Sequence, residues 1–295
     1  MRIVTCMRWG KAFPPVYVNV LFRAVRDNLP GEFKFVCLTD NGDGLDPGIE
    51  IQPIPELNLP DAAWRSGVWP KVGVFKDGTY PPGSRVLFID LDTMINGSLE
   101  PFFERNAPFE AIQQSAWDHS TRDKPWIYRV GKPMIQRLKR GRRKPQLHEV
   151  ATKPPVGGVS GREILANTMN TSVFAFDGNA HTDICDALLA DIPDALQKFR
   201  NEQHFVEHHV EHYEPWPKGR VISFKYALRQ PLLKDIFVHP KAPPPHASIL
   251  AFHGDPRPLD FATNWLSSRR ELPHVWVGRV KWFRDYWARY SDRAD

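Results

Sequence analysis

The sequence contains few cysteines. Only three occur in 295 residues, namely Cys6, Cys37 and Cys185. They have neither the spacing of a metal site nor that of a disulfide framework. Cys6 and Cys37 lie in apolar runs, where a free cysteine behaves as a small core residue. The low count indicates a reducing compartment and argues against a scaffold held together by disulfides.

Long apolar runs, repeats and targeting signals are also absent. No stretch is long and apolar enough for a membrane-spanning helix. Residues 1–4 enter a strand pattern directly, without the regions of a signal peptide. We therefore expect a cytoplasmic protein, with peripheral contact with the inner face of a membrane as an open alternative. The length allows one large domain, alone or with a lobe.

Strand and helix patterns alternate along the first part of the chain. Residues 2–7, 33–38 and 86–89 are apolar runs of strand length, and residues 16–28 have the apolar spacing of a helix. This alternation predicts an α/β fold with a mostly parallel sheet flanked by helices. Further strands are expected at 49–54, 109–113, 169–176 and 248–252, and further helices at 70–75, 98–103, 181–189 and 202–210.

The middle of the chain departs from this pattern. Residues 115–165 are polar, basic and rich in glycine and proline, and we expect a long irregular insertion there. Eight lysines and arginines lie within residues 129–144, with no acid among them. Such a run is usually a solvated segment, but it could face phosphates or an anionic membrane.

The C-terminal part combines aromatic and basic residues. Trp276, Val280, Phe283 and Trp287 follow helical spacing, with arginines and lysines between them. We expect a domain over residues 1–265 and a C-terminal helical segment over 266–295. The helix either packs on the domain or lies on an anionic membrane with its aromatic side chains among the headgroups.

The most informative motif follows the apolar run 86–89. This run ends in Asp90 and Asp92, with one residue between them. Ligands of α/β sheets bind at the carboxyl ends of the strands. Carboxylate oxygens suit Mg²⁺ or Mn²⁺, which often share them with substrate phosphates. A cation site is therefore one interpretation, and an ordinary solvated turn is the other.

Other polar residues could complete such a site. His253 follows an apolar strand and is either a third metal ligand or a structural histidine. Asn170 and Ser172 would project from one side of a strand, where they could bind sugar hydroxyls or satisfy a turn. Glu202 and Gln203 begin a predicted helix, where they either cap it or flank a reacting sugar.

Taken in order, these motifs resemble those of one family. Asp-Leu-Asp-Thr at 90–93, Asn-Thr-Ser-Val at 170–173, Glu-Gln at 202–203 and His-Gly-x-x-Arg-Pro at 253–258 resemble motifs of nucleotide-sugar glycosyltransferases similar to glycogenin and the lipopolysaccharide galactosyltransferases. The resemblance covers roughly residues 1–265 and implies the Rossmann-like GT-A fold. Two positions depart from the family, because Glu202 replaces an aspartate and Arg257 replaces a lysine.

The resemblance implies a metal-dependent enzyme. It would move a hexose from a UDP-sugar donor to a glycan or lipid-linked acceptor, with retention of anomeric configuration. Mn²⁺ or Mg²⁺ would be held by Asp90, Asp92 and His253, while Glu202 and Gln203 would be the catalytic pair near the anomeric carbon. The donor would contact Tyr17, Lys71, Asp90, Asn170, Ser172, Lys225, Gly254 and Arg257. Helix packing explains the aromatic ring of Tyr17 nearly as well.

Two other functions are considered. Phosphatases of the haloacid dehalogenase type also place Asp-x-Asp after an apolar strand, but their threonine lies one residue further from the first aspartate than Thr93 does, and their motif comes near the N-terminus. The basic residues at 129–144 and 275–290 could instead bind nucleic acid, yet no nucleic-acid module is recognisable. The order of the motifs favours the glycosyltransferase.

Overall fold

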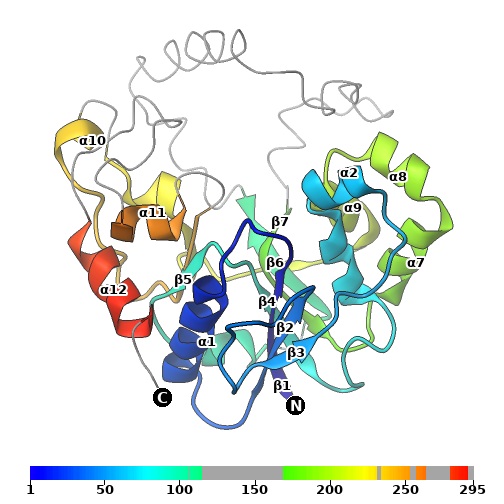
Figure 1. The fold of residues 1–295 in the computed structure, drawn as a ribbon, viewed down its shortest axis with the longest axis horizontal. Helices are drawn as coiled ribbons and strands as arrows, with labels where there is room; N and C mark the ends of the chain where they lie inside the picture. The colour runs from blue at the N-terminus through cyan, green and yellow to red at the C-terminus, as the bar shows by residue number, and fades with distance from the viewer. Residues whose placement is uncertain (106, 115–168, 231–233, 253–256, 264–279, 292–295) are drawn as a thin grey trace, which may run out of the picture.

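The computed structural model describes residues 1–105, 107–114, 169–230, 234–252, 257–263 and 280–291 (Figure 1). The predicted insertion at 115–165, with its basic run, lies outside these residues. The same is true of His253, Gly254 and the predicted domain boundary at 265.

A central sheet organises the molecule. Among the described residues it has seven strands in the order β3-β2-β1-β4-β7-β6-β8. Neighbours from β3 to β4 pair in parallel, as do β6 and β8, whereas β7 runs antiparallel to β4 and β6. The predicted mostly parallel sheet is confirmed, with β7 reversed. The strands are β1 (Arg2–Arg8), β2 (Lys34–Thr39), β3 (Glu50–Gln52), β4 (Arg85–Ile89), β6 (Phe109–Gln113), β7 (Met169–Asp177) and β8 (Glu214–Pro215).

Both faces of the sheet are covered, so its central strands are apolar on both sides. In β4, Leu87 and Ile89 join the core under α1 (Val16–Asn28). Phe88 joins the opposite core. This core is covered by the 3₁₀-helix η1 (Trp69–Phe75) together with α7 (Thr182–Ala190) and α9 (Glu202–His209) (Figure 1). The strand periodicity of two therefore sends successive side chains into two different cores.

A small second sheet lies beside the central one. Its order is β5-β10-β9, and the strand predicted at 248–252 is β10, the middle member. The strands are β5 (Thr93–Ile95), β9 (Val221–Ser223) and β10 (Ile249–Ala251). The remaining helices are α2 (Asp61–Arg65), η2 (Glu100–Phe102), α7 (Thr182–Ala190), α8 (Ile192–Lys198), α9 (Glu202–His209), the π-helix η4 (Phe224–Leu228), α10 (Lys234–Phe237), α11 (Pro258–Thr263) and α12 (Lys281–Ser291).

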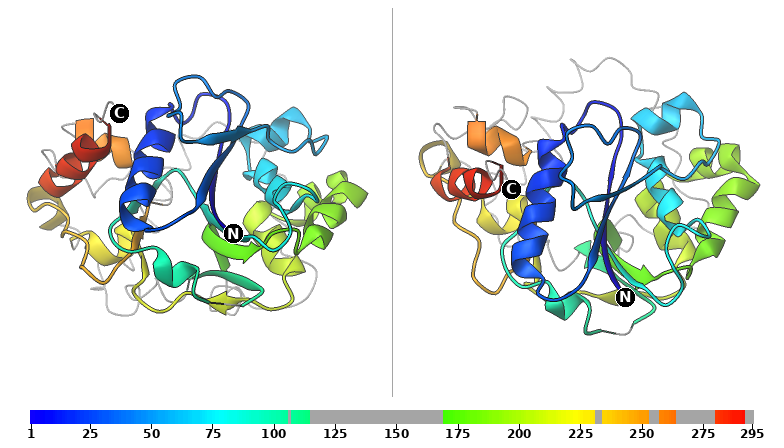
Figure 2. Two further views of the ribbon diagram at one scale, coloured as in Figure 1. Left: turned by 90° about the horizontal axis from the view of Figure 1, so that it is seen from below. Right: turned by 60° about the horizontal axis from the view of Figure 1, so that its bottom comes forward.

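The C-terminal helix α12 packs against α1 (Figure 2). Phe283 is fully buried and Trp287 is 7% exposed, and Arg23 of α1 donates to the carbonyl oxygens of Tyr290 and Ser291. Phe283 and Trp287 therefore pack on the domain, as one of the two alternatives predicts. Peripheral contact with a membrane stays a prediction. An amphipathic stripe serves either purpose, so its sequence pattern does not distinguish them. No described helix is long and apolar enough to cross a membrane.

Candidate functional site

The Asp-x-Asp turn is fixed at the carboxyl end of β4. The Asp90 N–H donates to the carbonyl of Ser172 on β7 at 2.8 Å. The Asp90 carbonyl accepts from the Thr93 hydroxyl, also at 2.8 Å. Strand β4 thus ends where β7 begins, so the motif after β4 faces the polar start of β7, as the antiparallel register of these strands requires.

A buried lysine joins this turn to two other elements. The Lys71 ammonium lies 2.8 Å from Asp90 Oδ1 and 3.3 Å from Glu202 Oε1. It also donates to the Thr171 carbonyl at 3.1 Å, and it lies 5.0 Å from the centre of the Phe88 ring. We call Lys71, Asp90, Thr171 and Glu202 the lysine cluster.

The backbone before η1 brings Lys71 to this position. Gly67 and Val68 both have positive φ, +80° and +58°, and the 3₁₀-helix begins directly after them at Trp69, with Pro70 in its first turn. The Gly67 carbonyl accepts from the Glu202 N–H at 2.9 Å. A Cβ at residue 67 would lie 2.5 Å from the Trp69 indole nitrogen, so only glycine fits this turn. The start of η1 and the start of α9 are thereby held together.

Burial and charge shift the pKa values of two members of the lysine cluster. Burial lowers the pKa of Lys71, but the attraction of Asp90 and Glu202 outweighs burial, so the pKa is raised and the lysine is a cation. Burial raises the pKa of Glu202, against the opposing effects of Lys71 and the Thr171 hydroxyl, which donates to Glu202 Oε1 at 2.5 Å.

The predicted pair Glu202 and Gln203 begins α9, but the two side chains have different surroundings. Asn201 caps this helix by accepting from the His204 N–H at 3.1 Å. Glu202 is only 3% exposed. Gln203 is less buried, and its Oε1 accepts from the Asn170 side chain at 3.1 Å. Gln203 and Asn170 are therefore the polar pair nearer to the surface.

Asp90 and Asp92 are the two carboxylates predicted to hold a cation. Both residues are partly exposed, and the Asp92 carbonyl accepts from the Phe252 N–H at 2.9 Å. Oxygen donors at a partly open strand end fit a hard divalent cation. Within the described ranges no group of three His, Cys, Asp or Glu side chains that could hold a metal occurs. The predicted third ligand, His253, lies outside those ranges.

A second cation lies on the rim of the same edge. The Arg257 guanidinium stacks on Phe13 at 4.3 Å and donates to the Ala12 carbonyl. Beneath them, Tyr17 is 4% exposed, between Phe13 and Trp287. Its hydroxyl accepts from the Leu259 N–H at 3.3 Å. The packing interpretation of Tyr17 is thus what the structure shows, whereas its contact with a base stays a prediction.

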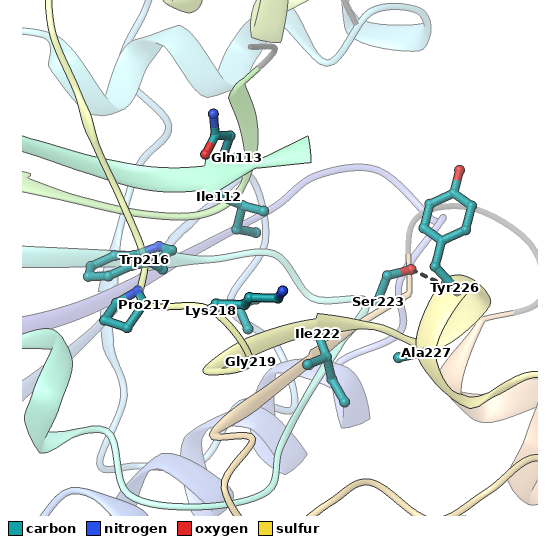
Figure 3. A pocket seen from close by; sticks show the side chains of 11 residues that line it. Ile112, Gln113, Trp216, Pro217, Lys218, Gly219, Ile222, Ser223, Tyr226 and Ala227 are labelled. Carbon is teal, nitrogen blue, oxygen red and sulfur yellow. Dashed lines mark hydrogen bonds between the residues drawn. The ribbon is translucent and has the colours of Figure 1, made fainter. Parts of the chain in front are cut away.

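A cavity of about 140 Å³ lies between β6 and the segment 216–227 (Figure 3). Ile112 on its wall pairs with Asn170. In the small sheet, Ser223 of β9 pairs with Ala251 of β10, and Ala251 pairs in turn with Thr93 of β5. The cavity therefore adjoins both the Asp-x-Asp turn and the start of β7. Its polar lining comes from Gln113, Lys218, Ser223 and Tyr226, and the predicted donor contact Lys225 precedes Tyr226 on the π-helix η4.

No family model and no curated protein sequence matches this chain, but solved structures match its fold. The galactosyltransferase LgtC, solved with donor and acceptor sugar analogues, is 10% identical over 100% of this chain and 98% of its own, with a TM-score of 0.54. The glycosyltransferase GlyE of Streptococcus pneumoniae TIGR4 is 12% identical over 100% of this chain and 62% of its own, with a TM-score of 0.55. The bifunctional glycosyltransferase WbbM is 10% identical over 99% of this chain and 49% of its own, with a TM-score of 0.54.

The chain has the GT-A fold. The fold predicted from the sequence is therefore confirmed. At these identities the similarity establishes the GT-A fold alone, and activity has to be argued from the site.

Several residues predicted for the site lie together, and Thr171, which was not predicted, lies among them. The structure brings Lys71, Asp90 and Glu202 together, and it joins Asn170 to Gln203. Thr171 holds Glu202 through its hydroxyl and Lys71 through its carbonyl. Its position inside the Asn-Thr-Ser-Val motif was the available signal, but the partner of its hydroxyl is set only by the folded chain.

Proposed function

We propose that the protein is a glycosyltransferase that uses a nucleotide-sugar donor, with UDP as the nucleotide and a hexose as the sugar. The observation that carries the proposal is the position of Asp90 and Asp92 at the carboxyl end of β4, in a chain that matches the glycosyltransferase fold along its whole length. Glycosyltransferase neighbours also favour this activity over phosphatase chemistry or nucleic-acid binding.

Each group has a role in this proposal. Asp90 and Asp92, with His253, would hold Mn²⁺ or Mg²⁺. Such a cation supplies positive charge that stabilises a departing diphosphate. Arg257 would meet the same phosphates, because a guanidinium can donate to two of their oxygens at once. Tyr17, Ser172, Lys225 and Gly254 remain proposed donor contacts.

The reacting end of the donor would lie beside Gln203 and Asn170. Both side chains carry amide groups that can bind sugar hydroxyls or a developing charge.

The glycan or lipid-linked acceptor would then enter from the cavity beside β6, which adjoins Asn170 through Ile112. Gln113→Ala and Tyr226→Ala should raise the KM for the acceptor several-fold and leave donor hydrolysis unchanged. We also propose that the anomeric configuration is retained. The configuration at the anomeric carbon of the product tests this.

UDP binding with and without Mn²⁺ is the decisive measurement, made by calorimetry on the parent and on Asp92→Ala. We expect binding of the parent to strengthen at least tenfold with Mn²⁺, and this gain to disappear in Asp92→Ala. Asp77→Ala, which removes an exposed acid in the turn after η1, is the control and should behave as the parent. If the parent protein does not bind UDP in the presence of Mn²⁺, the proposal is refuted.

A further inference from the structure

Every N–H of the Lys71 ammonium has an acceptor inside the protein. The three acceptors are Asp90 Oδ1, Glu202 Oε1 and the Thr171 carbonyl, at 2.8, 3.3 and 3.1 Å. A lysine ammonium has three donors. None is left for a phosphate or a sugar hydroxyl.

The members of the lysine cluster differ in their access to solvent. The side chains of Lys71 and Glu202 are 6% and 4% exposed, whereas that of Asp90 is 25% exposed. Phe88 closes the cluster on the side of the sheet. Asp90 is thus the charged member of the cluster through which the others can influence a ligand.

We propose that Lys71 and Glu202 are positioning residues for Asp90. Glu202, held by the Thr171 hydroxyl, fixes the ammonium, and the ammonium fixes Asp90 Oδ1, so that Asp90 meets a divalent cation in one orientation. The inference rests on the cation site of the proposed function. It replaces the sequence-based expectations that Lys71 contacts the donor and that Glu202 is catalytic.

One Glu202 oxygen links two members of the lysine cluster. It accepts from the Thr171 hydroxyl at 2.5 Å and lies 3.3 Å from the Lys71 ammonium. The Thr171 carbonyl accepts from the same ammonium at 3.1 Å. Thr171 therefore holds both Glu202 and Lys71, which keeps the ammonium in place beside Asp90.

The test uses a double variant, Lys71→Met with Glu202→Gln. It removes the ammonium together with the Glu202 carboxyl group, so this group is not left buried without its cation. We expect affinity for Mn²⁺ alone, measured by electron paramagnetic resonance of the free ion, to fall about tenfold, as on loss of groups that orient metal ligands. Affinity for UDP and for a UDP-hexose in the presence of a chelator should stay within about twofold of the parent, because in this proposal neither side chain touches the nucleotide or the sugar.

Two controls calibrate these measurements. Arg257→Ala should weaken UDP binding in the chelator, since it removes a direct phosphate contact. Arg23→Met with Asp46→Asn removes a buried ion pair of 2.6 Å that α1 makes outside the lysine cluster. This double variant should leave the affinities for Mn²⁺ and for UDP unchanged. If it lowers them, the loss of any buried ion pair has that effect and the result for the lysine cluster is not specific.

The outcomes separate the possibilities. A tenfold loss of affinity for UDP or for the UDP-hexose in the chelator would mean that Lys71 or Glu202 contacts the donor. An unchanged Mn²⁺ affinity would mean that they do not position Asp90. Should the double variant not fold, Thr171→Val replaces it, with an expected loss of about threefold in Mn²⁺ affinity and with Thr171→Ser as the rescue; equal affinities overturn the inference. A parent that binds neither Mn²⁺ nor UDP refutes the proposed function itself.

Discussion

Lys71 and Arg257 lie at the same edge of the sheet, but the protein surrounds them differently. Lys71 is buried among two carboxylates and a carbonyl oxygen. Arg257 is partly exposed on the Phe13 ring, with a backbone carbonyl as its acceptor. All three donors of Lys71 have acceptors inside the protein, which is why we propose that it positions its neighbours. A stacked guanidinium at the surface keeps donors for a ligand, because it carries five. Charge alone therefore does not identify a phosphate contact.

The largest effect should come from Lys71→Met alone. The substitution leaves Glu202 and Asp90 without their cation, and loss of one partner of a buried ion pair costs about 3–5 kcal/mol. Urea unfolding should show this loss, whereas Arg257→Met should change the free energy of unfolding by only about 0.5 kcal/mol. Equal losses for the two variants would remove the contrast between the two cations.

Arg257→Ala should have the next largest effect, on binding. A hydrogen bond to a charged group contributes about 1.5–3 kcal/mol, so UDP affinity should fall roughly 10- to 100-fold. Arg257→Lys should lose less, because it keeps the charge but not the paired donors. Calorimetry on the three proteins measures this order. Unchanged UDP affinity in Arg257→Ala would assign the phosphate contact elsewhere.

Tyr17→Phe should have a smaller effect, on stability. It removes the hydroxyl that accepts from the Leu259 N–H and leaves the ring between Phe13 and Trp287. A hydrogen bond of this kind contributes about 0.5–1.5 kcal/mol. Thermal unfolding should show a loss of this size. A variant as stable as the parent would show that the bond to Leu259 contributes nothing.

The smallest effect should be a pH dependence from Glu207. This half-buried carboxyl accepts from the Met169 N–H, and burial raises its pKa to about 7. Unfolding returns the pKa to its ordinary value, so the folded state holds the proton between about pH 4.5 and 7 and loses stability as the pH rises through that window. Since solvent reaches the group, we expect only about 1 kcal/mol. Urea unfolding of Glu207→Gln against pH should lack this contribution, and a parent without it would contradict the shift.

The local elements of the fold could be predicted well from the sequence. The strand at 2–7 is β1, the helix at 16–28 is α1 with those same bounds, and the run at 86–89 is the buried part of β4. Short elements were missed, including α2 and β5. Their five and three residues are too few to show a period.

The candidate site was predicted in outline because its motifs follow strands and begin helices, and these are local features. The sequence by itself determined which segments form buried strands and that Asp90 and Asp92 follow one of them. It did so because side-chain periodicity reports burial directly. Only the tertiary structure decided that β7 runs antiparallel, that α12 covers α1, and that Lys71 is enclosed by Asp90, Thr171 and Glu202. A buried strand has the same pattern in either direction, an amphipathic helix fits protein or lipid, and the partners of a buried charge come from residues distant in the chain.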